Sequence, residues 1–345
     1  MGRGNLTALV ILAFLILFFP LVVTSPYYIR VINFAGIFSI ICIGLSLLMG
    51  YAGQISIGQA GFFAIGAYTS AILTVHFGCN IWLAAFVGVI INALTAFIVG
   101  IPTLKLHGHY LAMATLGIGE IIHITARADM EDLTALIYAL GVRIGLNAES
   151  LSSVLKPFEA LTGGPSGIPG IPTLGIGGMT LNTPSQWFYL IWSVVLILMI
   201  LSLNLIHSRI GRALRAIHGN EEAARAMGIN ASRLKVWTFV ISSVTASVAG
   251  SIYAHYVKFI SPDTFSINES IFYLVIVSVG GMMNVWGAVI GSITMTILPE
   301  TLRAFHDYDI LMYGIVLLAI MMFMPEGMVG LGQRVFRSVR SKVRM

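Results

Sequence analysis

Charged side chains are scarce in this sequence of 345 residues. Asp, Glu, Lys and Arg together make up 10% of it, while 57% of the residues are hydrophobic. A soluble domain usually carries about 25% charged residues, and the mean hydropathy of +0.92 lies outside the soluble range. The composition therefore argues against two soluble domains, which the length alone would allow, and predicts an all-α polytopic membrane protein.

Cysteines and the signatures of common enzymes are also few. Cys42 and Cys79 form no C-x-x-C pair, so neither a disulfide framework nor a metal site is expected. No lysine follows a glycine, which excludes the G-x-x-x-x-G-K loop for ATP, and H-E-x-x-H, G-x-S-x-G and G-x-G-x-x-G do not occur. We expect no catalytic residues and no cofactor bound by this chain.

Long hydrophobic runs are abundant. About 20 apolar residues cross a membrane as a helix, and this template places ten spans along the chain. They cover roughly residues 6–24, 31–49, 59–77, 81–100, 110–126, 187–206, 236–257, 268–283, 286–301 and 310–324. The first span is expected to remain uncleaved, because no A-x-A-like site follows it.

The positions of the basic residues predict the orientation of these spans. The net charge is +5, but most of the 19 Lys and Arg residues fall at residues 3 and 105, within 207–235, and in the tail 332–345. With ten spans, all four places lie on one side of the membrane. This is the positive-inside pattern of cytoplasmic loops and argues against nucleic-acid binding. Both termini are therefore expected in the cytoplasm.

The longest polar segment of that side, residues 207–235, is predicted to be a cytoplasmic loop with a short helix in its middle. Asn220 is a good N-cap, and Glu221 and Glu222 lie in the first turn, where the helix dipole favours anions. Gly228 is placed to end the helix.

A helix of two turns is marginal in water, so this one needs a surface to lie on. Ala223, Ala224 and Met227 are predicted to form a face small enough to enter a groove of a partner. The alternative is a basic loop that only fixes the topology.

Glycine-rich stretches interrupt the apolar pattern twice. Between the second and third spans the chain reads GYAGQISIGQAGFFAIGAY, with Gln54, Ser56 and Gln59 among its glycines. Non-helical backbone at membrane depth is tolerated only when buried in protein or lining a wet cavity. The pattern favours a broken helix beside a translocation pathway, or else a tight turn with small residues for close packing. A similar stretch at 280–291 fits a transporter with internal repeats.

Span five places Glu120 and His123 one turn apart in an apolar helix. A charged side chain at the bilayer centre costs about 2.5–3.5 kcal/mol on insertion scales, so an intramembrane Glu usually faces a cavity or a partner. Glu120 is therefore a candidate pathway residue, with a structural hydrogen bond to a neighbouring helix as the alternative. His255 and His306 are interpreted as interfacial residues.

Residues 127–186 are predicted to be a long external loop with more acidic than basic side chains. Its apolar residues recur at helical spacing within 133–140 and 151–158, which predicts two amphipathic helices on the outer surface. The following LTGGPSGIPGIPTLGIGG is too rich in Gly and Pro for a span and is predicted to be a stiff extended loop.

Several motifs in order make the chain similar to the LivM-type permease family of branched-chain amino-acid ABC importers. They are GYAGQISIGQAGFFAIGAY, ATLGIGEI, LTGGPSGIPGI, the Glu222-Ala223-Ala224 to Gly228 loop, VGGMMNVWGAVIGS, LPETLR and MFMPEGMVGL. The resemblance covers nearly the whole length, so residues 1–345 are expected to form one transmembrane permease domain. The segment from about 130 to 159 is longer than the family's usual link.

The resemblance implies a fold like that of ten-span type II ABC importers, in a bacterial inner membrane. The implied partners are a related second permease, two cytoplasmic ATPases that use ATP and Mg, and a periplasmic substrate-binding protein. The central loop, with Glu221, Glu222, Ala223, Ala224 and Gly228, would couple to the ATPase. The candidate pathway residues are Gln54, Ser56, Gln59, Glu120, Thr162, Gly163 and Gly164.

Two other functions remain as alternatives. A permease for urea or short amides resembles this family closely. A proton-coupled carrier or channel using Glu120 would be of a different class, and it has no evident use for the Glu222 to Gly228 loop.

Overall fold

The chain is all-helical apart from short strands, as predicted. In the computed structural model the described residues are 3–23, 25–103, 109–127, 161–176, 179–302, 309–324 and 327–330. The first helices are α1 (Arg3–Val22), α2 (Pro26–Ser46), α3 (Gln59–Val75), α4 (Ile81–Thr103) and α5 (His109–Arg127), and a π-helical turn, η1 (Leu47–Tyr51), extends α2.

The second half continues the helical bundle. Its helices are α8 (Pro184–His207), α9 (Arg209–Gly219), α10 (Glu221–Ala226), α11 (Ala231–Val257), α12 (Ile267–Gly280), α13 (Val285–Leu302) and α14 (Asp309–Phe323). The 3-10 turns are η2 (Gly164–Ser166) and η3 (Pro262–Phe265), and the strands are β1 (Ile168–Pro169), β2 (Gly175–Ile176), β3 (Met179–Thr180) and β4 (Phe259–Ile260).

Every predicted span overlaps one of these helices. Six of them are long and apolar enough to cross a membrane, namely those at 5–22, 26–51, 81–103, 184–207, 231–257 and 285–302, and α3 and α12 are shorter apolar helices. The protein is therefore a polytopic membrane protein, and the number of ten crossings stays a prediction.

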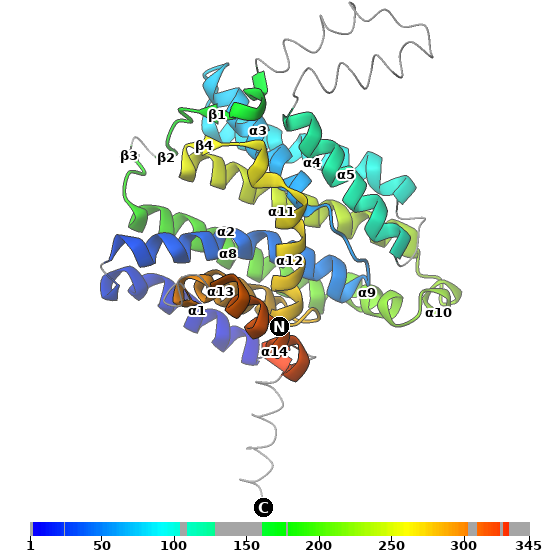
Figure 1. The fold of residues 1–345 in the computed structure, drawn as a ribbon. Coiled ribbons are helices and arrows are strands. Elements are labelled where there is room, and N and C mark those ends of the chain that lie inside the picture. The colour runs from blue at the N-terminus through cyan, green and yellow to red at the C-terminus, as the bar shows by residue number, and fades with distance from the viewer. Residues whose placement is uncertain are drawn as a thin grey trace, which may run out of the picture.

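The helix ends fall into two sets at opposite ends of the bundle (Figure 1). At one, the α10 end, the Tyr51 hydroxyl donates to the carbonyl of Met283 at 2.9 Å, and Gly53 lies against His218 of α9. At the other, the strand end, β1 pairs with β4 and the Trp82 indole donates to Gly175. Successive long helices run between these ends in alternating directions, which agrees with the predicted sequence of crossings.

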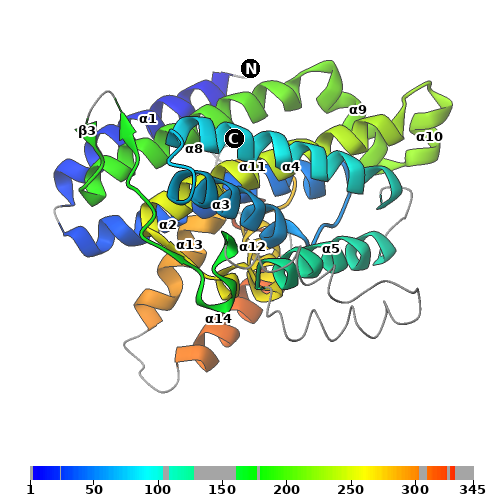
Figure 2. The same cartoon turned by 90° about the horizontal axis from the view of Figure 1, so that it is seen from above.

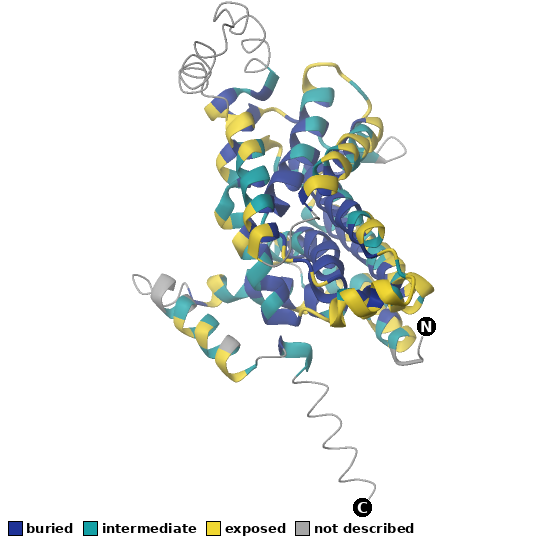
Figure 3. Cartoon of the chain, turned by 90° about the vertical axis from the view of Figure 1, so that its right-hand side faces the viewer, coloured by how far each residue is buried: buried dark blue, intermediate teal, exposed yellow. Residues whose placement is uncertain are grey.

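Small residues bring the backbones of the central helices into contact. A Cβ added at Gly66 of α3 would overlap the Ser247 carbonyl of α11, and one at Gly250 would overlap the Phe63 carbonyl. On the other side of α11, Gly44 of α2 lies against Thr245. Helices in lipid associate through such close packing, because lipid offers no hydrophobic driving force between them. Buried residues accordingly fill the centre of the bundle, and exposed ones follow its periphery (Figure 3).

His255 lies two residues before the end of α11, so its interfacial depth stays a prediction, but its side chain does not face the membrane–water interface. The side chain is fully buried, with Nδ1 2.7 Å from the Pro172 carbonyl and Nε2 2.8 Å from the Ser70 hydroxyl. A carbonyl only accepts, so Nδ1 carries the proton and Nε2 accepts from Ser70. The ring thus ties the loop before α8 to α3 and α11. His306 lies outside the described residues.

The outer segment is described only from residue 161 on. There Leu161 and Thr162 are helical, and the described residues of the Gly-Pro stretch from Gly163 on are non-helical apart from η2, as predicted, with positive φ at Gly163, Gly164, Gly167 and Gly170. The amphipathic helices predicted within 133–140 and 151–158, Lys105 and the tail 332–345 lie outside the described residues.

We expect Gly66→Ala to destabilise the protein by about 1–3 kcal/mol, because the added methyl overpacks the α3–α11 contact. The measurement is the melting temperature of the purified protein in detergent. Gly117→Ala is the control, because a Cβ there meets no described atom within 4 Å. Equal melting temperatures of the two variants would show that the contact is not tight.

Candidate functional site

The polar loop folds as the sequence predicts and protrudes at one end of the bundle as α9 and α10 (Figure 1). The side chain of Asn220 caps α10 by accepting from the backbone N–H of Ala223 at 3.0 Å. Glu221 and Glu222 lie in its first turn. Gly228 follows with a φ of 81°, a left-handed conformation that glycine adopts without strain. The predicted N-cap, first turn and end of the helix are all confirmed.

The exposed face of α10 differs from the prediction at one residue. Ala224 is buried against Ile217 of α9 and Ala231 of α11, so it cannot enter a groove of a partner. Ala223 and Glu222 are exposed, and Met227 is 82% exposed. A helix this short needs packing to be stable, and the small side chain of Ala224 lets α10 lie close to both neighbours.

Glu221 forms an ion pair with a lysine in the first turns of α11. Its carboxylate contacts the Lys235 ammonium, which is almost buried, and also the exposed Arg225 guanidinium at 2.7 Å. Burial raises the pKa of Glu221. The hydrogen bonds and charges of Lys235 and Arg225 together lower the pKa by more than burial raises it, so the pKa lies below its ordinary value of 4.5. Sequence reasoning missed Lys235 as this partner, because the two residues are 14 positions apart on different helices.

The first glycine-rich stretch is a broken helix, as predicted. After η1 the chain is non-helical over 52–58, and Gly53 has a φ of 67°. The side chains of Gln54, Ser56 and Gln59 are at most 2% exposed. Among the described residues, Gln59 Nε2 donates to Ser242 at 3.0 Å, while the Gln54 amide, the Ser56 hydroxyl and Gln59 Oε1 have no partner. Buried polar atoms are normally hydrogen-bonded to protein or water. These unpaired atoms are therefore consistent with bound internal water or with a second conformation of residues 52–58 in which they find partners.

The second stretch is also interrupted, and it packs on the first. Gly281, with a φ of 115°, separates α12 from α13. A Cβ at Gly50 would overlap the Met282 carbonyl, and the Tyr51 hydroxyl binds the next carbonyl of this turn. The two breaks thus form one contact at the α10 end.

Glu120 lies in the middle of α5 with its side chain 37% exposed. Its Oε1 is 3.4 Å from His123 Nδ1, and the other ring nitrogen of His123 is buried without a partner among the described residues. Glu120 differs in its mid-helix position from the other charged residues of the described helices that overlap the predicted spans, which lie within about two turns of a helix end. A carboxylate on the surface of a membrane-spanning helix is costly in lipid, so the predicted crossing of α5 requires water or protein beside this face.

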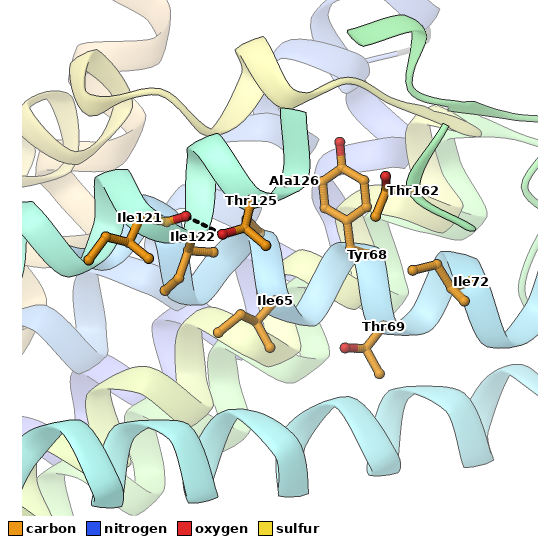
Figure 4. A pocket seen from close by; sticks show the side chains of 10 residues that line it. Ile65, Tyr68, Thr69, Ile72, Ile121, Ile122, Thr125, Ala126 and Thr162 are labelled. Carbon is orange, nitrogen blue, oxygen red and sulfur yellow. Dashed lines mark hydrogen bonds between the residues drawn. The ribbon is translucent and has the colours of Figure 1, made fainter. Parts of the chain in front are cut away.

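Thr162, Gly163 and Gly164 lie at the strand end, beside a groove between α3 and α5 (Figure 4). The groove has a volume of about 270 Å³ and is lined by Ala64, Ile65, Tyr68, Thr69, Ile72, Ile121, Ile122, Thr125, Ala126 and Thr162. Tyr68 and Thr162 both contribute a hydroxyl group to this lining (Figure 4). The Thr162 hydroxyl also accepts from the backbone N–H of Gly164 at 3.4 Å.

The predicted site residues therefore gather in two regions. Glu221, Glu222, Ala223, Ala224 and Gly228 belong to α10. The others belong to α5 or to segments in contact with it. The first break, with Gln54 and Ser56, contacts α5 where the backbone N–H of Ile57 donates to the Thr115 hydroxyl at 3.1 Å. Glu120 lies on α5 itself, and Thr162 lines the groove between α3 and α5. In the described part of the chain, no three His, Cys, Asp or Glu residues are grouped to hold a metal.

Comparison with known proteins gives a consistent result. A family model described as "Branched-chain amino acid transport system / permease component" matches residues 27–325. The chain is 30% identical to the high-affinity branched-chain amino acid transport permease protein LivM of Salmonella typhimurium, over 85% of this chain and 67% of that one. No solved structure matches.

Two more distant relatives cover more of their own length. The probable branched-chain amino acid transport permease protein LivM of Methanocaldococcus jannaschii is 25% identical, over 85% of this chain and 90% of that one. The permease protein LivH of Escherichia coli is 24% identical, over 85% of this chain and 91% of that one.

Lys235→Met should loosen α10, because it leaves the Glu221 carboxylate without its less exposed partner. A hydrogen bond to a charged group contributes roughly 1.5–3 kcal/mol, so hydrogen exchange of residues 221–226 should become faster by about tenfold or more. The control is Arg225→Met, which removes an exposed pair worth about 1 kcal/mol or less. Since folding lowers the pKa of Glu221, the pair should stabilise α10 fully above pH 4.5 and weaken as the pH falls further. Equal exchange in both variants at neutral pH would contradict this role of Lys235.

Proposed function

This chain belongs to the family of permease components of branched-chain amino acid transport systems, and we propose on that basis that it is one membrane subunit of an ATP-driven importer. It would receive branched-chain or other hydrophobic amino acids from a periplasmic binding protein and pass them into the cytoplasm. Its partners would be a related second permease and two cytoplasmic ATPases that use ATP and Mg. The observation that carries the proposal is α10, a short capped helix held out from the bundle.

The exposed face of α10 supports docking to an ATPase subunit. Glu222, Ala223 and Met227 are available to a partner, whereas Glu221 and Ala224 fix the helix to α11 and α9. A helix that only connected two spans would not require one face fixed to the bundle and another face left exposed. We therefore assign the contact with the ATPase to the exposed residues and the positioning of the helix to the buried ones.

The arrangement of the helix ends supports cytoplasmic termini. The start of α1 lies at the α10 end, since α1 finishes at Val22 beside the start of α2 at the strand end. Near the other terminus, Gly327 is packed on Gly281 of the second break. ATP is cytoplasmic, so docking to an ATPase places the α10 end and both described ends of the chain there. The strand end then faces the binding protein, and ten crossings fit this arrangement.

The face of α5 supports a translocation pathway past Glu120. The first break, which holds Gln54 and Ser56, contacts α5 through Ile57 and Thr115 at the proposed cytoplasmic end, and Thr162 lines the groove at the proposed outer end. The urea or amide permease is not favoured by the relatives named above, which carry branched-chain amino acid names. A carrier or channel using Glu120 would leave α10 without a role.

The test is leucine uptake by the complete importer in proteoliposomes that contain ATP, with loaded binding protein outside. The wild type should accumulate leucine only with ATP. Gly228→Pro should abolish uptake and the stimulation of ATPase activity while the complex still reaches the membrane, because proline cannot adopt the positive φ of this residue. Uptake driven by a proton gradient without ATP would instead establish a carrier, and normal stimulation in Gly228→Pro would rule out coupling through α10.

Glu120→Gln should lower leucine uptake by at least about fivefold with little loss of assembled complex, because the carboxylate faces the pathway and not the core. Assembly is measured by size-exclusion chromatography in detergent, and uptake is measured in proteoliposomes. If the variant assembles poorly while the surviving complexes transport at the normal rate, Glu120 is a structural residue.

A further inference from the structure

We propose that the groove between α3 and α5 holds the aliphatic side chain of the transported amino acid while the permease is open to the outside. The proposal rests on the proposed function, because it takes an aliphatic amino acid as the solute. It adds a binding site within the permease itself, which is distinct from the site of the binding protein.

Glycine contacts give the groove its shape. The backbones of α3 and α5 touch near the α10 end, where a Cβ at Gly61 would come 2.9 Å from Cα of Gly119 and one at Gly119 would come 3.1 Å from Cα of Gly58. The two backbones therefore leave no space for a side chain between them at this point. Towards the strand end the residues that face each other become larger, and the space between them forms the groove. The groove therefore ends at this contact on the α10 side and extends towards the strand end.

The lining selects an aliphatic group of moderate size. Ile65, Ile72, Ile121 and Ile122 provide branched apolar side chains, and none of the lining residues is charged. The volume of about 270 Å³ is slightly below the roughly 300–1,000 Å³ of pockets for drug-sized ligands. Such a site suits a smaller solute whose apolar part is removed from water on binding.

The polar groups at one end favour an amino acid over a lipid chain. Tyr68 is 6% exposed, and its hydroxyl has no hydrogen-bond partner among the described residues. Tyr68 lines the groove together with Thr162 (Figure 4). The amino and carboxyl groups of an amino acid can bind both hydroxyls, whereas a lipid acyl chain can bind neither. Ile121 also adjoins Glu120, whose partly exposed carboxylate disfavours lipid along this face.

The groove has a lining residue at which its occupant can be excluded by substitution. In Figure 2, α3 lies between α4 and α5. Thr69 is half-buried, lines the groove and lies near Gly88 of α4, so a larger side chain there fills space at the α3 wall of the site. On α4, Thr95 is also half-buried in an apolar helix, but its hydroxyl binds the Ile91 carbonyl at 2.9 Å and it does not line the groove. The two threonines make a matched pair for substitution.

The experiment compares Thr69→Phe with Thr95→Phe in the reconstituted importer with leucine-loaded binding protein. Thr69→Phe should reduce leucine uptake at least tenfold while retaining most of the stimulation of ATPase activity, because docking and α10 are unchanged. Thr95→Phe should behave like the wild type. Equal uptake by both variants would overturn the groove site, whereas absence of ATP-dependent leucine uptake by the wild type would overturn the proposed function itself.

A photoactivatable leucine analogue with a diazirine in its side chain provides a second measurement that does not depend on turnover. Delivered by the binding protein to the complex without ATP, it should label peptides of α3 and α5 that line the groove, and excess leucine should prevent the labelling. Labelling of these peptides by a photoactivatable phospholipid, with none by the leucine analogue, would show that the groove is a lipid site and would overturn the proposal.

Discussion

Contact between helix backbones at small residues is the constraint on which this structure depends. In a membrane the side chains of neighbouring helices gain little by leaving lipid, so packing distance largely decides how strongly helices associate. Gly66 and Gly250 bring α3 and α11 together, Gly44 brings α2 against α11, and Gly61 and Gly119 join α3 to α5. These contacts place α11 at the centre and join α5 to the bundle through α3.

The same contacts connect the proposed docking helix with the proposed groove. The ion pair of Glu221 and Lys235 fixes α10 to the foot of α11. From there α11 packs on α3, and α3 packs on α5 through the glycine contact that closes the groove. Beside this route lie the first break and its unpaired Gln54 and Ser56. A displacement of α10 by an ATPase would therefore reach the closed end of the groove through rigid neighbours, and the polar atoms of the break would find new partners.

Much of the fold was predictable because lipid imposes simple rules on a sequence. Apolar runs located a helix at every predicted span, glycines located both breaks, and Asn220 and Gly228 located the ends of α10. The errors concern long-range contacts. The burial of Ala224 depends on Ile217 and Ala231 of other helices, and that of His255 depends on Ser70 and Pro172, far away in the chain. Neither the Glu221–Lys235 pair nor the groove has a local signal, because each arises only when separate helices meet.

The most direct test of the account is the position of Met227 in the working importer. Met227→Cys, in a background with Cys79→Ser and with the buried Cys42 retained, would be treated with a membrane-impermeant maleimide on each side of the membrane and with a short bifunctional cross-linker. Labelling only from the cytoplasmic side and cross-linking to an ATPase subunit are predicted, with Asn182→Cys at the strand end labelled only from outside. Labelling of Met227→Cys from outside, or no cross-link in a complex that imports leucine, would contradict the account.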